Sequence, residues 1–322
     1  MKKPLAILLS DLHLSQNAPV ARSAEPNWFD VIRRQWRPVN KTARKYNIPL
    51  VIAGDIFDRW NASPEVINLA IELFDAHTIY AVPGQHDLPN HCLDQIHRSA
   101  YGVLADANII ENVQPSPLYP SCTRIDNLSK YKIYMHGFPW GHEPHPINPT
   151  KFADDPNLRS ENPIHIAVVH KYIWTQGTGY TGAPEETKLT DNTVNKFAGY
   201  DAVVVGDNHQ HFHHKHIFNS GSFIPRHSNE QYSHTPCYGI LWSDRRITKH
   251  LLPTEEDKWI STFDIKEISE VKHTEFVRML ENLGGEQLEF TSTLKLYLDK
   301  QKVTGRVKEI VMEVLEEDGT TK

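Results

Sequence analysis

The sequence predicts an α/β fold in which short buried strands alternate with helices. Five apolar runs rich in β-branched residues have the length and composition of buried strands. They are residues 5–9, 50–53, 79–82, 164–169 and 202–205. Acidic and histidine residues follow these runs directly or within a few positions. Because the carboxyl ends of strands in an α/β sheet meet along one rim, we expect these polar side chains to gather in one site.

Helical segments are predicted between the first strands. The stretch from Trp28 to Tyr46 contains no glycine and one proline, Pro38, which predicts one helix bent at that proline or two short helices. Ser63 and Pro64 are typical of a helix start, with the serine as N-cap and the proline in the first turn. Strand, helix and polar motif then alternate, as a layered α/β fold requires.

The remainder of the chain predicts a change of pattern and a second unit. After Asp207 the sequence becomes rich in strands and loops, and from about residue 255 it indicates a separate β-α-β-α module, with strands over 258–265 and 288–298 and helical stripes over 271–283 and 307–315. We therefore expect one domain over residues 1–254 and a small one over 255–322. The second carries 10 Lys or Arg and 16 Asp or Glu, which accounts for the whole net charge of −6. This acidity fits an ordinary solvated surface at least as well as a docking face.

Composition favours a globular protein. A chain of 322 residues can bury one large core and add a small domain. No apolar run approaches the roughly 20 residues that a membrane-spanning helix needs. The cysteines Cys92, Cys122 and Cys237 are odd in number and lack C-x-x-C spacing, which is typical of reduced thiols in the cytoplasm. We expect a cytoplasmic location and no membrane partner.

The polar motifs predict a metal-dependent hydrolase. They are Asp11-Leu12-His13, the stretches 54–59 and 84–87, His136-Gly137, His170 and the stretch 206–211. Aspartate and histidine from several strands offer carboxylate oxygen and imidazole nitrogen, the donors that divalent metals take in proteins. Two cations about 3.5–4 Å apart need one shared ligand, and a carboxylate bridges them well.

In this order the motifs resemble those of the calcineurin-like metallophosphoesterase superfamily, which read D-x-H, G-D-x-x-D-R, G-N-H-D/E, H and G-H-x-H. The resemblance spans about the first 210 residues and implies a four-layer α/β/β/α metallophosphoesterase sandwich with a small C-terminal α/β module. It also implies a ligand set: Asp55 bridges two divalent metal ions, Asp11, His13 and His209 complete the first shell, and Gln85, His170 and Asp207 complete the second. A water that bridges the metals would attack phosphorus in line.

The same resemblance assigns roles to three more residues. His86, next to Gln85, would donate a proton to the leaving oxygen. Asp58 would orient His86. Arg59 would clamp the phosphate, because a guanidinium offers a planar fork of donors.

Two positions depart from the family motifs. Gln85 stands in place of asparagine, and Asp207 stands in place of the first histidine of G-H-x-H. Both changes fall on the second metal and make its shell richer in oxygen, which favours Mn²⁺, or else Mg²⁺, over Zn²⁺. Two alternatives stay open: a weakened second site, and a register in which His209 and His211 are the ligand pair while Asp207 is structural.

Within the superfamily the chain is most similar to SbcD-type DNA repair exonuclease subunits. The similarity lies in residues 10–14, in residues 54–59 leading into 61–65, and in the small module that occupies the place of a DNA-capping domain. It implies Mn²⁺-dependent cleavage of DNA phosphodiesters, by an exonuclease or an endonuclease. It also implies an SMC-like ATPase partner and a homodimer.

A basic stripe supports DNA as a partner independently. Arg34, Arg37, Lys41 and Arg44 lie broadly on one side of the predicted helix, where they could contact phosphates. Trp28, Phe29 and Trp36 interleave this stripe. Aromatic residues at such positions of a helix more often anchor it in the core than stack on bases.

Other functions remain compatible with the motifs. Residues 10–14 and 54–58 also resemble UDP-diacylglucosamine pyrophosphohydrolases, which cleave nucleotide-sugar lipids, although the sequence shows no apolar lid for a membrane surface. A small-molecule phosphodiesterase or phosphatase is another alternative. A metal-binding scaffold without activity is disfavoured, because it would not need His86.

Overall fold

The computed structural model describes residues 2–113, 115, 121–123, 131–149, 163–228 and 230–260. These residues belong to the first of two compact units, which spans Met1–Ile260. The module predicted over 255–322 therefore lies outside the described residues, except for 255–260. These six residues form a turn and irregular structure, so the strand predicted over 258–265 is absent from its described part.

The first sheet has six strands in the order β12-β11-β1-β2-β3-β4. Its strands are β1 (Pro4–Leu9), β2 (Leu50–Ala53), β3 (Ile79–Val82), β4 (Glu111–Asn112), β11 (Cys237–Trp242) and β12 (Ile247–Leu251). Strands β1 to β4 run parallel, while β11 pairs antiparallel with β1 and β12 antiparallel with β11. The predicted strands at 50–53 and 79–82 form with the expected bounds.

The second sheet has the order β5-β6-β7-β8-β10-β9. Its strands are β5 (Ser121–Thr123), β6 (Lys132–Phe138), β7 (Pro163–His170), β8 (Ala202–Gly206), β9 (Phe212–His214) and β10 (Ile217–Asn219). The four central strands are parallel and the two edge strands are antiparallel. Both sheets are therefore mixed, with mainly parallel pairing.

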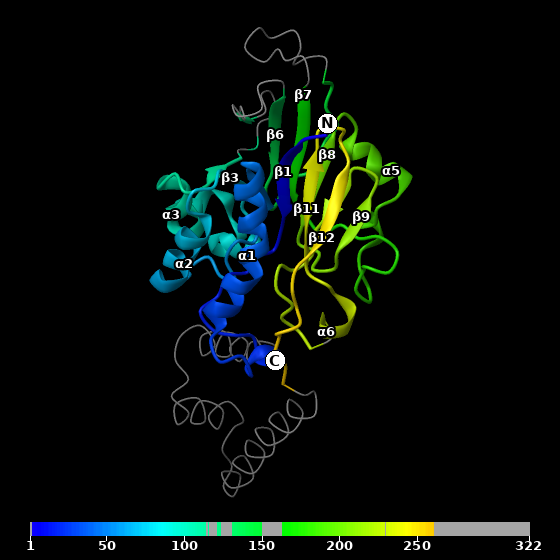
Figure 1. Cartoon of the computed structure of the whole chain (residues 1–322). Helices are drawn as coiled ribbons and strands as arrows, with labels where there is room; N and C mark the ends of the chain where they lie inside the picture. The colour runs from blue at the N-terminus through cyan, green and yellow to red at the C-terminus, as the bar shows by residue number, and fades with distance from the viewer. Residues whose placement is uncertain are drawn as a thin grey trace, which may run out of the picture. The chain divides into compact units, whose positions relative to one another are not determined.

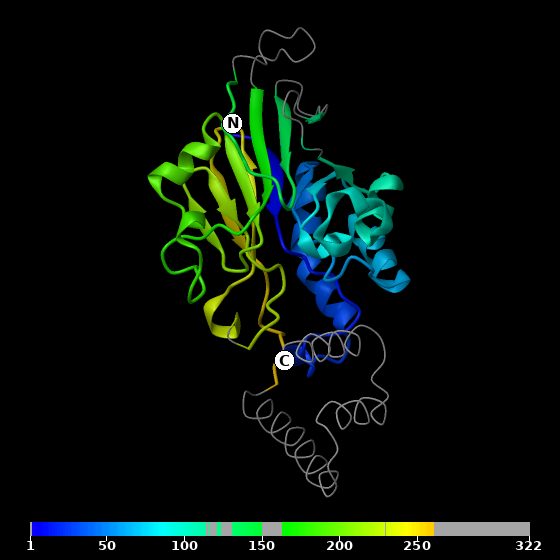
Figure 2. The same ribbon diagram turned by 180° about the vertical axis from the view of Figure 1, so that it is seen from behind.

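Helices cover the outer faces of the two sheets. The α-helices are α1 (Trp28–Tyr46), α2 (Pro64–Phe74), α3 (Ala100–Asp106), α5 (Asp191–Val194) and α6 (Glu230–Ser233). The 3₁₀ turns are η1 (Val20–Arg22), η2 (Gln85–Asp87), η3 (Pro89–His91), η4 (Leu93–Arg98), η5 (Glu185–Thr187) and η6 (Asn195–Phe197). Helices α1 to α3 lie beside the first sheet and α5 beside the second (Figure 1). The reverse view shows these two helical groups on opposite sides of the strands (Figure 2).

Alternating side chains along the strands create the layers. In β1, Ile7 and Leu9 pack into the core under α1 and α2, while Ala6 and Leu8 pack into a second core shared with the other sheet. This alternation is what a strand with both faces buried requires. A third core, with Phe197 as one member, lies on the outer face of the second sheet. The four-layer α/β/β/α sandwich is thus confirmed.

The first helices match their sequence signals closely. Helix α1 is a single helix that contains Pro38, and Asn27 caps it by accepting a hydrogen bond from the Phe29 N–H. Trp28 and Trp36 are buried core anchors, as expected. Helix α2 begins at Pro64 after Ser63, but the serine side chain makes no capping hydrogen bond. Within the described part of the chain, no helix is both long and apolar enough to cross a membrane.

Candidate metal centre

The predicted ligands come from loops at the carboxyl ends of β1, β2, β3, β7 and β8. Asp11, His13, Asp55 and Asp207 all have positive φ, between 44° and 78°. Left-handed backbone at residues other than glycine costs on the order of 1–3 kcal/mol and is concentrated at functional sites. Backbone hydrogen bonds hold two of these residues in place: the Asp11 N–H donates to Gly54 O at 3.1 Å, and the His13 N–H donates to Asp55 O at 2.9 Å.

The first half of the centre contains Asp11, His13 and His209. Their donor atoms all lie within 4.8 Å of one another, and the Nε2 atoms of the two histidines are 3.0 Å apart. Burial lowers the pKa of both imidazoles, which favours the neutral form that binds a metal. Burial also raises the pKa of Asp11, a cost that a bound cation would offset.

Asp55 lies between the two halves. Its Oδ2 is 3.7 Å from His13 Nε2 and 3.5 Å from His170 Nε2, and its Oδ1 accepts a hydrogen bond from the His86 N–H at 3.0 Å. Burial opposes charge on both Asp55 and His170, but their mutual attraction outweighs it. This attraction lowers the pKa of Asp55 and raises the pKa of His170 to about 10. Asp55 thus occupies the position expected of a bridging ligand.

The second half contains Gln85, His170 and Asp207. His170 Nδ1 donates to Ala53 O at 2.7 Å, so that Nε2 points into the centre and lies 2.6 Å from Gln85 Oε1. Gln85 Nε2 in turn donates to Asp207 Oδ1 at 2.7 Å. Gly54 has φ +85°, and a Cβ there would lie 2.0 Å from His170 Nδ1, so this position requires glycine.

The geometry favours Asp207 and His209 as the ligand pair over the alternative pair of His209 and His211. His211 Nδ1 donates to Asn219 O at 2.6 Å, and its ring packs against Phe218 at 5.3 Å. Its neighbour His209 is the histidine that joins Asp11 and His13. His136, from the His-Gly motif, contacts another histidine of the second sheet instead: its Nε2 is 3.1 Å from His165 Nδ1.

His86 lies next to the first half of the centre. Its ring centroid is 5.0 Å from that of His13, and donor atoms of His13, Asp58 and His86 lie within 4.8 Å of one another. The expected orienting contact has a different form. His86 Nδ1 donates to the backbone carbonyl of Asp58 at 2.8 Å, while the Asp58 carboxylate pairs with Arg226.

The sequence assigned no role to two further residues near the centre. Arg226, whose side chain is 17% exposed, lies beside the centre through its contact with Asp58, whereas the predicted phosphate clamp, Arg59, is exposed. Asp87 is the second. Its carboxylate accepts hydrogen bonds from the N–H groups of Phe57 and Gly84, both at 3.0 Å, and of Ile56.

Asp87 therefore ties the loop after β2 to the loop after β3. Burial, helped by the negative charge of Asp55, raises the pKa of Asp87 to about 7. The final aspartate of the stretch 84–87 was the only hint of this role in the sequence.

The predicted basic stripe is reduced by internal ion pairs. Arg34 Nη2 lies 2.6 Å from Asp257 Oδ1 and 3.7 Å from Glu25 Oε1. Its charge is therefore already matched by acidic partners. Arg37, Lys41 and Arg44 are exposed on α1, so three of the four predicted cations remain on the surface.

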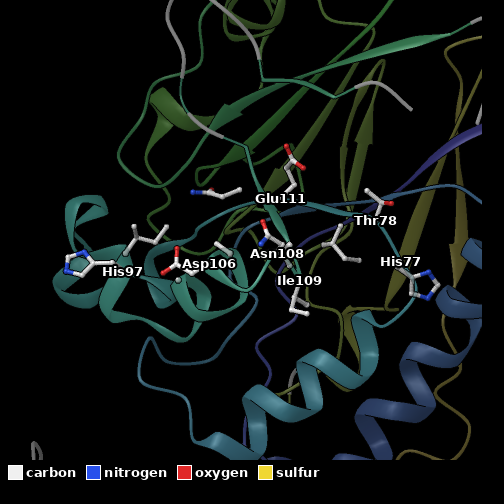
Figure 3. Close-up of a pocket in the computed structure, with 13 residues that line it drawn as sticks. His77, Thr78, His97, Asp106, Asn108, Ile109 and Glu111 are labelled. Atoms are coloured by element: carbon white, nitrogen blue, oxygen red, sulfur yellow. The ribbon is translucent and has the colours of Figure 1, made fainter. Parts of the chain in front are cut away.

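The cavities of the structure differ in whether predicted metal ligands line them. One cavity of about 550 Å³ lies at the amino end of β3 and is lined by His77, Asp106 and Glu111 (Figure 3). No predicted ligand lines it. By contrast, His170 and Asp207 line a cavity of about 260 Å³ together with Trp140 and Tyr172. Asp207 and His209 line a further cavity of about 550 Å³.

The residues of the centre fit divalent cations. Asp11 Oδ2 and Asp55 Oδ2 are buried and have no hydrogen-bond partner among the described residues. Buried polar atoms without a partner are uncommon and costly. A cation bound by such oxygen and imidazole donors would satisfy them.

Comparison with known proteins agrees with this geometry. The model of a family described as calcineurin-like phosphoesterase matches residues 6–211. No curated protein gives a significant match to the chain.

Proposed function

The chain belongs to the calcineurin-like phosphoesterase family, and on this premise we propose that it is a two-metal phosphodiesterase that cleaves DNA in the manner of an SbcD-type nuclease. Family membership and the clustered ligands support a metal-dependent phosphoesterase. The observation that carries the proposal is the convergence of the predicted ligands from five strand ends, with His86 beside them. A structural metal site would not need that histidine.

The two halves of the centre would hold one divalent cation each, with Asp55 between them. When bound, the cations supply an activated nucleophile and neutralise charge on the phosphoryl oxygens. His86 acts as the general acid. Its Nδ1 is fixed by the carbonyl of Asp58, so Nε2 is the atom that passes a proton to the leaving oxygen.

Arg226 is the better candidate for the phosphate contact. The Asp58 carboxylate fixes its guanidinium beside His13, and an arginine fork donates two hydrogen bonds to phosphate oxygens. Its positive charge also lowers the pKa of His13, behind burial and other neighbours, which indicates that the charge reaches the first half of the centre. Arg226 would therefore orient the phosphate for attack.

The choice of Mn²⁺ and DNA rests on finer observations. The second half offers an amide and a carboxylate oxygen around a single histidine, a set that favours Mn²⁺ or Mg²⁺ over Zn²⁺. Arg37, Lys41 and Arg44 keep an exposed basic strip on α1, which would attract a polyanion. An SMC-like ATPase partner and a homodimer belong to the same proposal, since they follow from the resemblance to SbcD-type subunits. A cytoplasmic location is proposed with them, from the cysteine pattern of the sequence.

Activity on two substrates tests the proposal. The full chain with Mn²⁺ should cleave both linear DNA and bis-p-nitrophenyl phosphate, and EDTA should abolish both activities until Mn²⁺ is restored. Hydrolysis of the aryl ester alone would indicate a small-molecule phosphodiesterase. Metal binding without either activity would indicate a scaffold.

The basic strip offers a matched comparison. Replacing Arg37, Lys41 and Arg44 together with alanine should weaken DNA cleavage and flatten its salt dependence. Replacing Arg33, whose guanidinium already pairs with Glu72 at 2.8 Å, should change DNA cleavage little.

A further inference from the structure

The cavity lined by Trp140 and Tyr172, here called the aromatic cavity, opens beside the second half of the metal centre. It has a volume of about 260 Å³, and His170 and Asp207 form part of its wall. A chemical group bound in this cavity would therefore be only a few bonds away, within the same substrate molecule, from a phosphate held at the metal centre. The volume lies just below the roughly 300–1,000 Å³ of pockets for drug-sized ligands, so it suits one compact ring system.

Both aromatic walls are held by their surroundings. The backbone N–H of Trp140 donates to Pro83 O at 3.1 Å. The indole ring of Trp140 packs edge-on against His170, with the ring centroids 6.4 Å apart. The Tyr172 hydroxyl accepts a hydrogen bond from the Tyr180 N–H at 3.2 Å, and the two tyrosine rings lie 5.1 Å apart. Rings fixed before binding lose little entropy when a ligand stacks on them.

A polar side chain in the wall of the same cavity suits a ligand with a hydrogen-bonding edge. His142 lines the cavity, and its Nδ1 is buried with no hydrogen-bond partner among the described residues. The remaining polar lining groups are satisfied: Lys171 pairs with Glu143, and the Thr187 hydroxyl donates to Pro184 O at 2.8 Å. A ring with a polar edge can form a hydrogen bond with the imidazole of His142, which a purely apolar ring cannot do.

We propose that the aromatic cavity binds one unpaired nucleobase of the substrate, stacked on Tyr172 and hydrogen-bonded to His142. This inference rests on the proposed function, because it assumes that the metal centre cleaves a nucleotide phosphodiester. It narrows the substrate class, since a base paired inside a duplex cannot enter a cavity. The substrate is therefore a single strand, a frayed end or a nucleotide turned out of the helix.

Two esters with the same leaving group test the inference. Thymidine 5′-(p-nitrophenyl phosphate) carries a base, whereas methyl p-nitrophenyl phosphate does not. Stacking of one base is worth about 1–3 kcal/mol, so the ratio of the two kcat/KM values should be about 5 to 150 for the unaltered chain. Tyr172→Leu should lower this ratio, and Tyr172→Phe should restore it. Because a ratio is compared, a general loss of activity cancels.

The surface tyrosine Tyr46, which packs on Trp242 at the end of α1, provides the matched control, and Tyr46→Leu should leave the ratio unchanged. A ratio near one in the unaltered chain, with both esters hydrolysed, would overturn the base site and leave the phosphodiesterase proposal standing. Failure to hydrolyse either ester would instead count against the proposed function.

A binding measurement tests the base site without turnover. A single-stranded oligonucleotide that contains 2-aminopurine should lose fluorescence when its base stacks in His86→Ala, and the added Tyr172→Leu change should remove this quenching. A blunt duplex with the same label should show much weaker quenching. Equal quenching by both forms of DNA, or quenching that survives Tyr172→Leu, would contradict the inference.

Discussion

In the first half of the metal centre Asp11 Oδ2 is buried without a hydrogen-bond partner among the described residues, while in the second half Gln85 bridges His170 and Asp207 through two short hydrogen bonds. Binding a cation therefore has a different energetic consequence in each half of the centre. In the first, a cation satisfies an oxygen that no described group of the protein satisfies, and it replaces one contact, that between His13 Nε2 and His209 Nε2 at 3.0 Å. In the second, it must replace hydrogen bonds that the ligands already make to one another. We expect the first ion to bind more tightly than the second.

The largest effect should come from a residue that belongs to neither ligand set. His86→Ala should lower phosphodiester cleavage by about 10²–10⁴-fold, because a general acid contributes that much, while the metal content stays the same. Metal analysis and the steady-state rate should be measured on the same preparation. His97→Ala, a change at an exposed histidine of η4, should alter neither quantity. Loss of metal from His86→Ala would show that His86 is a metal ligand. His86 would then have to be counted in the ligand set of the first half of the centre.

The next effect concerns the charge that faces the first half of the centre. Arg226→Gln should reduce kcat/KM by about 10- to 100-fold, the loss expected for a hydrogen bond to a charged group. Arg59→Gln should change it by less than about threefold, since surface substitutions away from a site usually cost within about 0.5 kcal/mol. Parallel kinetics on bis-p-nitrophenyl phosphate would measure both. The reverse order of effects would restore Arg59 as the phosphate clamp.

The contrast between Arg59 and Arg226 shows where sequence reasoning is strong. Strands β2 and β3 could be placed from their apolar runs, and the ligand motifs could be found because each one follows its strand within a few residues. Arg226 lies 168 residues from its partner Asp58 and carries no motif. No local pattern could pair the two.

Ion pairs on the predicted basic stripe were missed for the same reason. The partner of Arg34 is Asp257, which is 223 positions away, so the sequence showed a cation but not its neutralisation. The hydrogen bond between Gln85 and Asp207 likewise spans 122 positions. The sequence identified both residues as departures from the family, yet only the fold shows that the two side chains are hydrogen-bonded to each other.

The second half of the centre can be altered to sharpen the comparison. Gln85→Asn combined with Asp207→His restores the family residues and removes the hydrogen bond between positions 85 and 207. The preference should then move from Mn²⁺ toward Zn²⁺, because a second imidazole replaces a carboxylate, with a change of about 10- to 100-fold in relative affinity of the second ion. Competitive metal titration monitored by calorimetry would measure it. An unchanged preference would mean that these residues do not bind the second ion.

The smallest effect separates the two histidines of β7. At the carboxyl end, the attraction of Asp55 outweighs burial and raises the pKa of His170 to about 10. Burial lowers the pKa of His165 to about 4, although the Asp201 carboxylate opposes this and Arg245 assists it. The neighbouring His136 has its pKa lowered to about 3, again chiefly by burial. A histidine whose pKa is lower in the folded chain than the usual 6.5 makes the unfolded chain bind more protons between those two values. Stability is therefore complete above pH 6.5 and falls as the pH drops toward 4.

For His165 alone this loss should be on the order of 2 kcal/mol between pH 7 and pH 5. Urea unfolding at the two pH values would measure it, with His165→Gln as the comparison. The variant removes one titrating group of this pair and keeps a polar side chain, so its stability should depend less on pH than that of the unaltered chain. Equal pH dependence in both would show that His165 remains accessible to protons in the folded chain. The contrast between the middle of β7 and its metal-binding end would then be lost.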